Sequence, residues 1–104
     1  MKEKNNSEEY YTQFDNVFFE KTRLSILTML YKEEFVSFNR FKKMLGSSDG
    51  AIYTHLQKLV DVNYIKSRKE IKSNQVQTTY SLTEAGRRMF KKYMDFLESI
   101  VLNR

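Results

Sequence analysis

The chain has 104 residues, a single histidine and no cysteine or proline, which is enough for one domain with a modest core. The lack of cysteine excludes disulfides, thiol catalysis and thiolate metal sites, and the single His55 argues against a multi-histidine metal centre. No apolar run approaches membrane-spanning length, and the opening MKEKNNSEEYY lacks the apolar core of a signal peptide. We therefore expect a soluble cytoplasmic protein with no metal, no cofactor and no membrane partner, and not an enzyme.

The formal net charge is +5, and it is unevenly distributed. Residues 1–20 carry two Lys and five acids, which leaves sixteen Lys and Arg against eight acids in residues 21–104. A basic domain attracts polyanions by long-range electrostatics and counterion release. Many basic proteins bind no nucleic acid, so charge alone is weak evidence for such a partner.

The N-terminal fifth of the chain divides into two segments. Residues 1–9 are polar and are expected to be flexible. Residues 10–21 are expected to be helical, because their apolar side chains recur roughly on one helical face. These are Tyr10, Tyr11, Phe14, Val17 and Phe18. This segment is too short to be stable alone, so it must pack on the core or on a partner chain.

Three helices are predicted next. The first is capped by Thr22 and runs to about Lys32, followed by an extended Phe35-Val36. Ser37 caps the second, which ends at a left-handed Gly46. The inward side chains of this second helix are predicted to be Phe38, Phe41, Met44 and Leu45.

Ser48 caps the third helix, with Asp49 in its first turn. Its buried stripe is Ile52, Leu56, Leu59 and Val60, and Asn63 is a left-handed cap after it. His55 lies at the edge of this stripe, where packing and hydrogen bonding are favoured over catalysis or metal binding.

Residues 65–71 and 76–82 alternate with period two, which indicates two strands joined by a turn at Lys72-Ser73-Asn74-Gln75. Thr83 then caps a long helix to about Asn103, with Glu84 near its positive end. The order predicts an α+β, mostly helical fold: a winged helix-turn-helix with a three-helix core, a two-stranded wing and a long C-terminal helix for dimerisation. The DNA-binding domain would span residues 22–83 and the dimerisation helix residues 84–104.

The stretch from Thr22 to Leu102 resembles winged-helix transcriptional regulators of the MarR, ArsR and PadR type, and most of all their compact single-domain winged helix DNA-binding relatives. The residues that carry the resemblance are Arg23-Leu24-x-Ile26-Leu27, Ser37-Phe38-Asn39-x-Phe41, Asp49-Gly50, His55-Leu56-x-x-Leu59, Tyr64-Ile65 and Thr79-Tyr80-Ser81-Leu82-Thr83-x-x-Gly86-Arg87. The resemblance implies a homodimer that binds a pseudo-palindromic operator. One departure concerns the wing tip, where such regulators usually carry Gly-Arg and this chain has Ser73-Asn74. Lys72, Arg68 or Lys69 would then have to replace the arginine.

The exposed face of the third helix supplies the candidate base-reading residues. Gln57 could read adenine, Thr54 and Tyr53 could contact thymine methyls or phosphates, and Gly50 would let the backbone approach the duplex. The full set is Gly50, Tyr53, Thr54, Gln57 and Lys58. The alternative is an ordinary solvated helix face.

A second set is expected to contact phosphates from the second helix, the helix N-terminus and the wing. It comprises Arg40, Lys42, Lys43, Ser47, Ser48, Lys66, Arg68, Lys69, Lys72, Asn74 and Gln75. For the lysines the alternative is solubility, and for Ser48 it is helix capping.

A third set of apolar residues predicts a dimer interface, because the last helix is more apolar than a lone surface helix requires. It comprises Tyr11, Phe14, Phe18, Met89, Tyr93, Phe96, Leu97, Ile100 and Val101. Completion of a thin core is the alternative. The interface also offers an aromatic crevice for an unknown small-molecule effector.

We therefore hypothesise a homodimeric, sequence-specific regulator that binds double-stranded DNA. The competing hypothesis is a winged-helix module for protein–protein contact without specific DNA binding. The sequence identifies no operator, target gene or signal.

Overall fold

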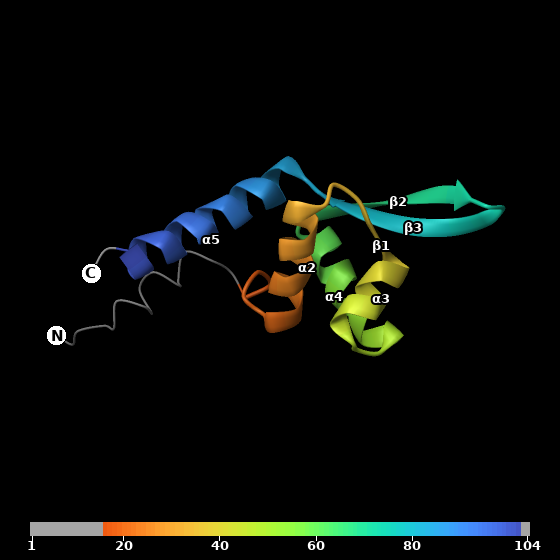
Figure 1. The fold of residues 1–104 in the computed structure, drawn as a ribbon, viewed down its shortest axis with the longest axis horizontal. Coiled ribbons are helices and arrows are strands. Elements are labelled where there is room, and N and C mark those ends of the chain that lie inside the picture. Colours follow the sequence, from red (N-terminus) through yellow and green to blue (C-terminus); the bar gives the residue numbers. More distant parts are fainter. Residues whose placement is uncertain (1–15, 103–104) are drawn as a thin grey trace.

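The computed structural model describes residues 16–102 and places seven elements in them (Figure 1). In chain order they are α2 (Lys21–Lys32), β1 (Val36–Ser37), α3 (Phe38–Leu45), α4 (Asp49–Asp61), β2 (Ile65–Lys72), β3 (Gln75–Leu82) and α5 (Glu84–Leu102). The α+β, mostly helical winged helix-turn-helix predicted from the sequence is confirmed. The expectations for residues 1–15, including Tyr11 and Phe14, lie outside the described residues.

Helix boundaries follow local capping chemistry. The Ser37 and Ser48 side chains accept hydrogen bonds from the Arg40 and Ala51 amides, and α3 ends at a left-handed Gly46 with φ 68°, as predicted. The prediction of Thr22 as the cap of α2 is wrong. Glu20 has the extended backbone of a cap, and its side chain accepts from the Arg23 amide, so α2 begins at Lys21.

The wing belongs to a three-stranded antiparallel sheet in the order β1-β3-β2. The sequence predicted two strands, and the structure has a third, β1. Because β1 is only two residues long, it is too short to show the alternating apolar pattern of a strand. The turn is also tighter than predicted. Only Ser73 and Asn74 lie outside the strands, with φ of 51° and 64°, as a two-residue hairpin turn with both central residues left-handed requires.

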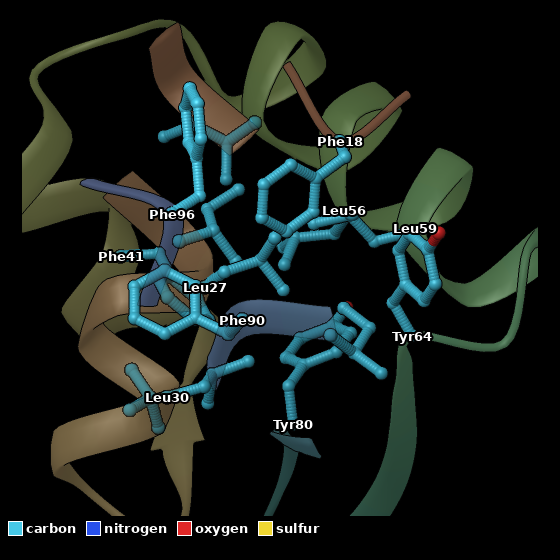
Figure 2. Close-up of a cluster of buried hydrophobic side chains, with 14 residues drawn as sticks. Phe18, Leu27, Leu30, Phe41, Leu56, Leu59, Tyr64, Tyr80, Phe90 and Phe96 are labelled. Atoms are coloured by element: carbon cyan, nitrogen blue, oxygen red, sulfur yellow. The ribbon is translucent and has the colours of Figure 1, made fainter. Parts of the chain in front are cut away.

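The core lies where α2, α3, α4, the base of the hairpin and α5 meet (Figure 2). Its fully buried side chains include Leu27 of α2, Phe41 of α3 and Leu56 of α4, joined by Phe18, which precedes α2. Met44, predicted to point inward, is 58% exposed, because α3 is only eight residues long and presents a narrow buried face. None of the helices in residues 16–102 has the length and hydropathy needed to cross a bilayer.

A hydrogen-bonded junction joins the end of α4 to the start of α5. The Thr83 amide donates to the Tyr64 carbonyl over 3.1 Å, and its hydroxyl donates to the Asn63 carbonyl over 2.6 Å. The same hydroxyl accepts from the Gly86 amide over 2.9 Å, which confirms Thr83 as the cap of α5. Asn63 is left-handed with φ 64°, as predicted. This junction fixes the direction in which α5 leaves the winged-helix body (Figure 1).

Candidate nucleic-acid interface

Helix α4 presents one face to the core and the opposite face to solvent. Ile52, Leu56 and Leu59 are at most 1% exposed and anchor the helix on α2 and the hairpin. All members of the predicted base-reading set are exposed: Gly50, Tyr53, Thr54, Gln57 and Lys58. The structure thus places the five on the outer face of a firmly anchored helix.

Two of these side chains are occupied by bonds within α4 itself. The Thr54 hydroxyl donates to the Gly50 carbonyl over 2.9 Å, and the Gln57 amide donates to the Asp61 carboxylate over 3.1 Å. Both bonds are exposed and local, so each competes with solvent and costs little to exchange. Asp61 therefore engages one N–H of the Gln57 amide and restrains its orientation.

The N-terminus of α4 lies beside the predicted phosphate contacts. Ser48 is exposed and its side chain caps the helix, while Ser47 is half-buried just before it. Lys42 of α3 pairs with Asp49 over 3.3 Å, which offsets the acid at this end of the helix. Free amides and the helix dipole at such an end favour an anion.

Strand register assigns the wing side chains to opposite faces of the hairpin. Lys69 pairs with Thr78 and Ile71 with Val76 on one face, because side chains alternate along a strand. Val76, Thr78 and Tyr80 from this face, together with Phe38 and Tyr53 of the helices, line a groove of about 350 Å³. In Figure 1 the helices α3 and α4 lie below the hairpin, on the side of this groove.

Lys66 and Arg68 belong to the opposite face, where they pair with Ser81 and Thr79. Both line a separate hollow that contains no residue of α3 or α4. The structure therefore brings Lys69 to the side of the recognition helix but not these two cations. By the same alternation Lys72, which pairs with Gln75, shares the face of Lys66 and Arg68, but it lies beside the turn at the tip of the hairpin. There Lys72, Asn74 and Gln75 are exposed beside Ile71 and Val76, which are 79% and 67% exposed.

Besides Lys42, two of the predicted cations already have acidic partners. Arg40 makes a two-point bond to Glu33, at 2.9 and 2.7 Å. The bond raises the pKa of Arg40 and lowers that of Glu33. Arg68 bonds Glu70 over 2.6 Å. Within residues 16–102, no ion pair engages Lys43, Lys58, Lys66, Lys69 or Lys72.

Behind α4, a buried arginine holds the helix in place. Arg23 is 8% exposed, and its guanidinium donates to the carbonyls of Val17 and Asn16, at 2.5 and 3.3 Å. It also lies 2.9 Å from His55 Nδ1, which must accept because arginine only donates. The predicted packing and hydrogen-bonding role of His55 is confirmed. Glu20 Oε1 lies 3.7 Å from the same Nδ1 atom of His55.

The predicted dimer residues fall into two groups. Phe18 and Phe96 are 0% and 6% exposed within the protomer, so they offer a partner almost no surface. Phe18 instead contacts Tyr93 edge-on, with ring centroids 5.4 Å apart. Met89, Tyr93 and Leu97 are half-buried, whereas Ile100 and Val101 are 38% and 57% exposed.

Sequence reasoning missed three features of the interface. Phe38 and Asn39 of α3 line the groove beside the wing, although the helical pattern assigned Phe38 to the core. Asp61 holds the amide of Gln57. The exposure of Ile71 and Val76 could have been found from their direct pairing next to the turn, where no helix can cover them. Among residues 16–102, no three His, Asp or Glu side chains are placed to hold a metal ion.

A helix-turn-helix whose second helix is exposed beside a β-hairpin defines the winged-helix class of proteins. Residues 22–101 match the family described as the winged helix DNA-binding domain, and the chain belongs to that family. An uncharacterised protein of Methanocaldococcus jannaschii is 33% identical over 78 residues, covering 75% of this chain and 85% of that protein. The resemblance to winged-helix regulators is therefore confirmed.

Solved structures share the fold. A transcriptional regulator homologue from Pyrococcus horikoshii has a TM-score of 0.81 at 20% identity, covering 93% of this chain and 96% of that one. The regulator HlyU of Vibrio vulnificus has a TM-score of 0.64 at 25% identity, covering 88% and 90%. PadR of Bacillus subtilis, solved with operator DNA, has a TM-score of 0.62 at 25% identity, covering 72% of this chain but 47% of PadR.

Proposed function

We propose that this protein is a sequence-specific transcriptional regulator that binds double-stranded DNA in the cytoplasm as a homodimer on a pseudo-palindromic operator. One observation carries the proposal: the exposed face of α4 and one face of the wing border a common groove, lined by Tyr53 and by Thr78. Helix α4 would enter a major groove, and the wing would hold the flanking backbone. PadR, which shares the fold, was solved in complex with operator DNA, and this supports DNA as the partner.

In this proposal Gln57 reads a base edge, while Tyr53, Thr54 and Lys58 contact neighbouring bases or phosphates. Gly50 leaves the start of α4 open, since a Cβ placed there would have no neighbour within 4 Å. Ser47, Ser48 and Lys43 would hold one phosphate strand. Lys69 on the groove face of the wing, with Lys72, Asn74 and Gln75 at its tip, would hold the other. Arg40 would contribute after exchanging Glu33 for a phosphate.

The proposed dimer uses the far end of α5. Ile100 and Val101 are exposed there, and Leu102 beside them is 68% exposed, so three consecutive apolar side chains face solvent in the protomer. Association through this end would remove that surface from water and present two copies of α4. The two half-sites would then lie about one helical turn of DNA apart.

The test is a DNA-binding titration across a salt series, with a duplex from the protein's own promoter and a random duplex of equal length. We expect tighter binding to the promoter and a steep fall with salt. Gln57→Ala should weaken promoter binding by about 1–3 kcal/mol and reduce the preference over random DNA. Lys72→Ala should weaken both duplexes alike and flatten the salt slope by about one unit.

An unchanged affinity and preference in Gln57→Ala would contradict the assigned reading face. Equal binding of both duplexes by the wild-type protein would contradict sequence specificity on this promoter. No binding of any duplex at low salt would favour the alternative, a winged helix that docks another protein. The exposed Ile71–Val76 pair at the wing tip is the feature that such a partner would use.

A further inference from the structure

A hollow of about 440 Å³ lies on the side of the hairpin that faces away from the α3–α4 groove. Four segments form it: the connection from α2 to β1, the base of β2, the end of β3 and the first turn of α5. Its lining residues are Glu34, Phe35, Lys66, Ser67, Arg68, Ser81, Leu82 and Arg87. This volume falls within the range of small-molecule sites, about 300–1,000 Å³.

Positive charge dominates the walls of the hollow. Lys66, Arg68 and Arg87 line it, against one lining acid, Glu34. Arg68 also bonds Glu70, which leaves part of its five-donor guanidinium unused. No ion pair within residues 16–102 engages Lys66 or Arg87. Converging cations without matching acids favour an anion.

Both guanidiniums are held by aromatic rings. Arg68 lies over the Phe35 ring with its central carbon 4.6 Å from the centroid, and Arg87 lies over Tyr31 at 5.0 Å. Stacking restrains a guanidinium plane while leaving its N–H edges able to donate to a carboxylate or phosphate. The arginines are therefore partly ordered before any ligand arrives, which lowers the entropy cost of binding.

The proposed DNA contacts leave this hollow unused. No residue of α3 or α4 lines it, and Lys66 and Arg68 project from the opposite hairpin face to Lys69. A duplex held by α4 and by the groove face of the wing would lie on the other side of the sheet. The cations in the hollow therefore require another explanation than operator binding.

We propose that this hollow binds a small organic anion through its carboxylate or phosphate group. Lys66, Arg68 and Arg87 would donate to the anionic group, and Phe35 and Leu82 would pack against the rest of the molecule. The bound anion would join β2 of the wing to the first turn of α5. By linkage, its binding and the binding of DNA would change each other's affinity by the same factor.

The first experiment measures binding by nuclear magnetic resonance with three probes: benzoate, inorganic phosphate and the uncharged benzamide. Benzoate or phosphate should shift amide signals of residues 66–68, 81–82 and 87, and benzamide should not. Benzoate binding alone assigns the site to carboxylates, and phosphate binding alone assigns it to phosphate esters. Shifts with neither anion, or equal shifts with benzamide, would overturn the proposal.

Two matched pairs of variants distinguish binding in the hollow from nonspecific attraction of an anion to the positive charge of the protein. Lys66→Gln and Lys69→Gln alter the same strand on opposite faces, and Arg87→Gln and Arg88→Gln alter adjacent residues of α5. Lys66→Gln and Arg87→Gln should each weaken binding of the anionic probe about tenfold. The partner variants should bind as the wild type does. Equal weakening within both pairs would overturn the proposal.

A DNA titration of the same variants separates this inference from the proposed function. If Lys66→Gln and Arg87→Gln weaken DNA binding as strongly as Lys72→Ala, the hollow serves DNA phosphates and the small-anion proposal is wrong. If they leave DNA binding intact while losing the anion, the proposal stands. Anion binding is measured without DNA, so the small-anion proposal can be supported even if the protein binds no DNA. Lys66 is exposed, so its variant keeps the test valid if Arg87→Gln disturbs the fold.

Discussion

Gly86 lies where the first turn of α5 passes against the end of α4. A Cβ at this position would lie 2.0 Å from the Tyr64 carbonyl oxygen and 3.1 Å from a Leu82 methyl. That oxygen also accepts a hydrogen bond from the Thr83 amide, so it cannot move without breaking the hydrogen-bonded junction between α4 and α5. We expect Gly86→Ala to lower the free energy of unfolding by about 3 kcal/mol, measured by urea denaturation.

Gly50→Ala is the matched control for this prediction. Its Cβ would meet no atom within 4 Å, and alanine is the better helix former by about 0.5–1 kcal/mol. We expect this variant to be as stable as the wild type or slightly more stable. Similar losses in both variants would contradict the close contact at Gly86.

Glu20 links helix capping to pH. Burial raises the pKa of its carboxyl, but the hydrogen bonds from the Arg23 and Thr22 amides and the charge of Arg23 outweigh burial and lower the pKa below its ordinary 4.5. A carboxyl with a depressed folded-state pKa stabilises the fold above its unfolded-state pKa. This contribution is lost as the pH falls through the folded-state value.

Glu20→Gln keeps an oxygen that can cap α2 but removes the charge. We therefore expect the wild type to be the more stable of the two at neutral pH. The difference should shrink as the pH falls below 4.5 and through the lower folded-state pKa of Glu20. Thermal unfolding of both proteins from about pH 7 to pH 3 measures it, and a difference independent of pH would contradict a charge effect.

At the scale of single elements, Asp61 of α4 competes with DNA for the side-chain amide of Gln57. Asp61 accepts the Gln57 amide and adds a negative charge to the proposed interface. If the proposed function holds, Asp61→Ala should tighten promoter binding by about threefold to tenfold, which corresponds to the loss of one exposed hydrogen bond worth about 0.5–1.5 kcal/mol. Its removal also relieves an acid near the negative end of the helix.

Glu98→Ala is the control for Asp61→Ala, because Glu98 is an exposed acid on α5 and its loss changes the net charge equally. We expect a smaller gain in affinity from this change, since screening weakens distant charges. Equal gains in the two variants would show that only net charge matters and that Gln57 is not restrained by Asp61.

At the scale of the whole molecule, α5 decides the oligomeric state that we propose. Ile100→Glu places a charge in the exposed apolar end of the helix, and burying that charge in an interface is costly. We expect the variant to sediment as a monomer at concentrations where the wild type is a dimer. Ile71→Glu, the same change at the wing tip, should remain a dimer. A monomeric wild type would contradict the proposed dimer.

The sequence by itself determined most of the elements and the exposed face of α4, because their signals are local. Capping by Ser37, Ser48 and Thr83 depends on neighbours three residues away, and the stripe on α4 depends on helical period. The outer face of α4 follows from the same period, which is why its five candidate residues are all exposed.

Only the tertiary structure decided which of these residues lie together. The pairing of β2 with β3 separates Lys66 and Arg68 from Lys69, and helix packing places Arg23 against His55, 32 positions away in the chain. The two-residue β1 exists because β3 accepts it, and the capping role passes to Glu20 because the buried Arg23 fixes the chain before α2. Such pairings join residues distant in sequence, and no local periodicity records them.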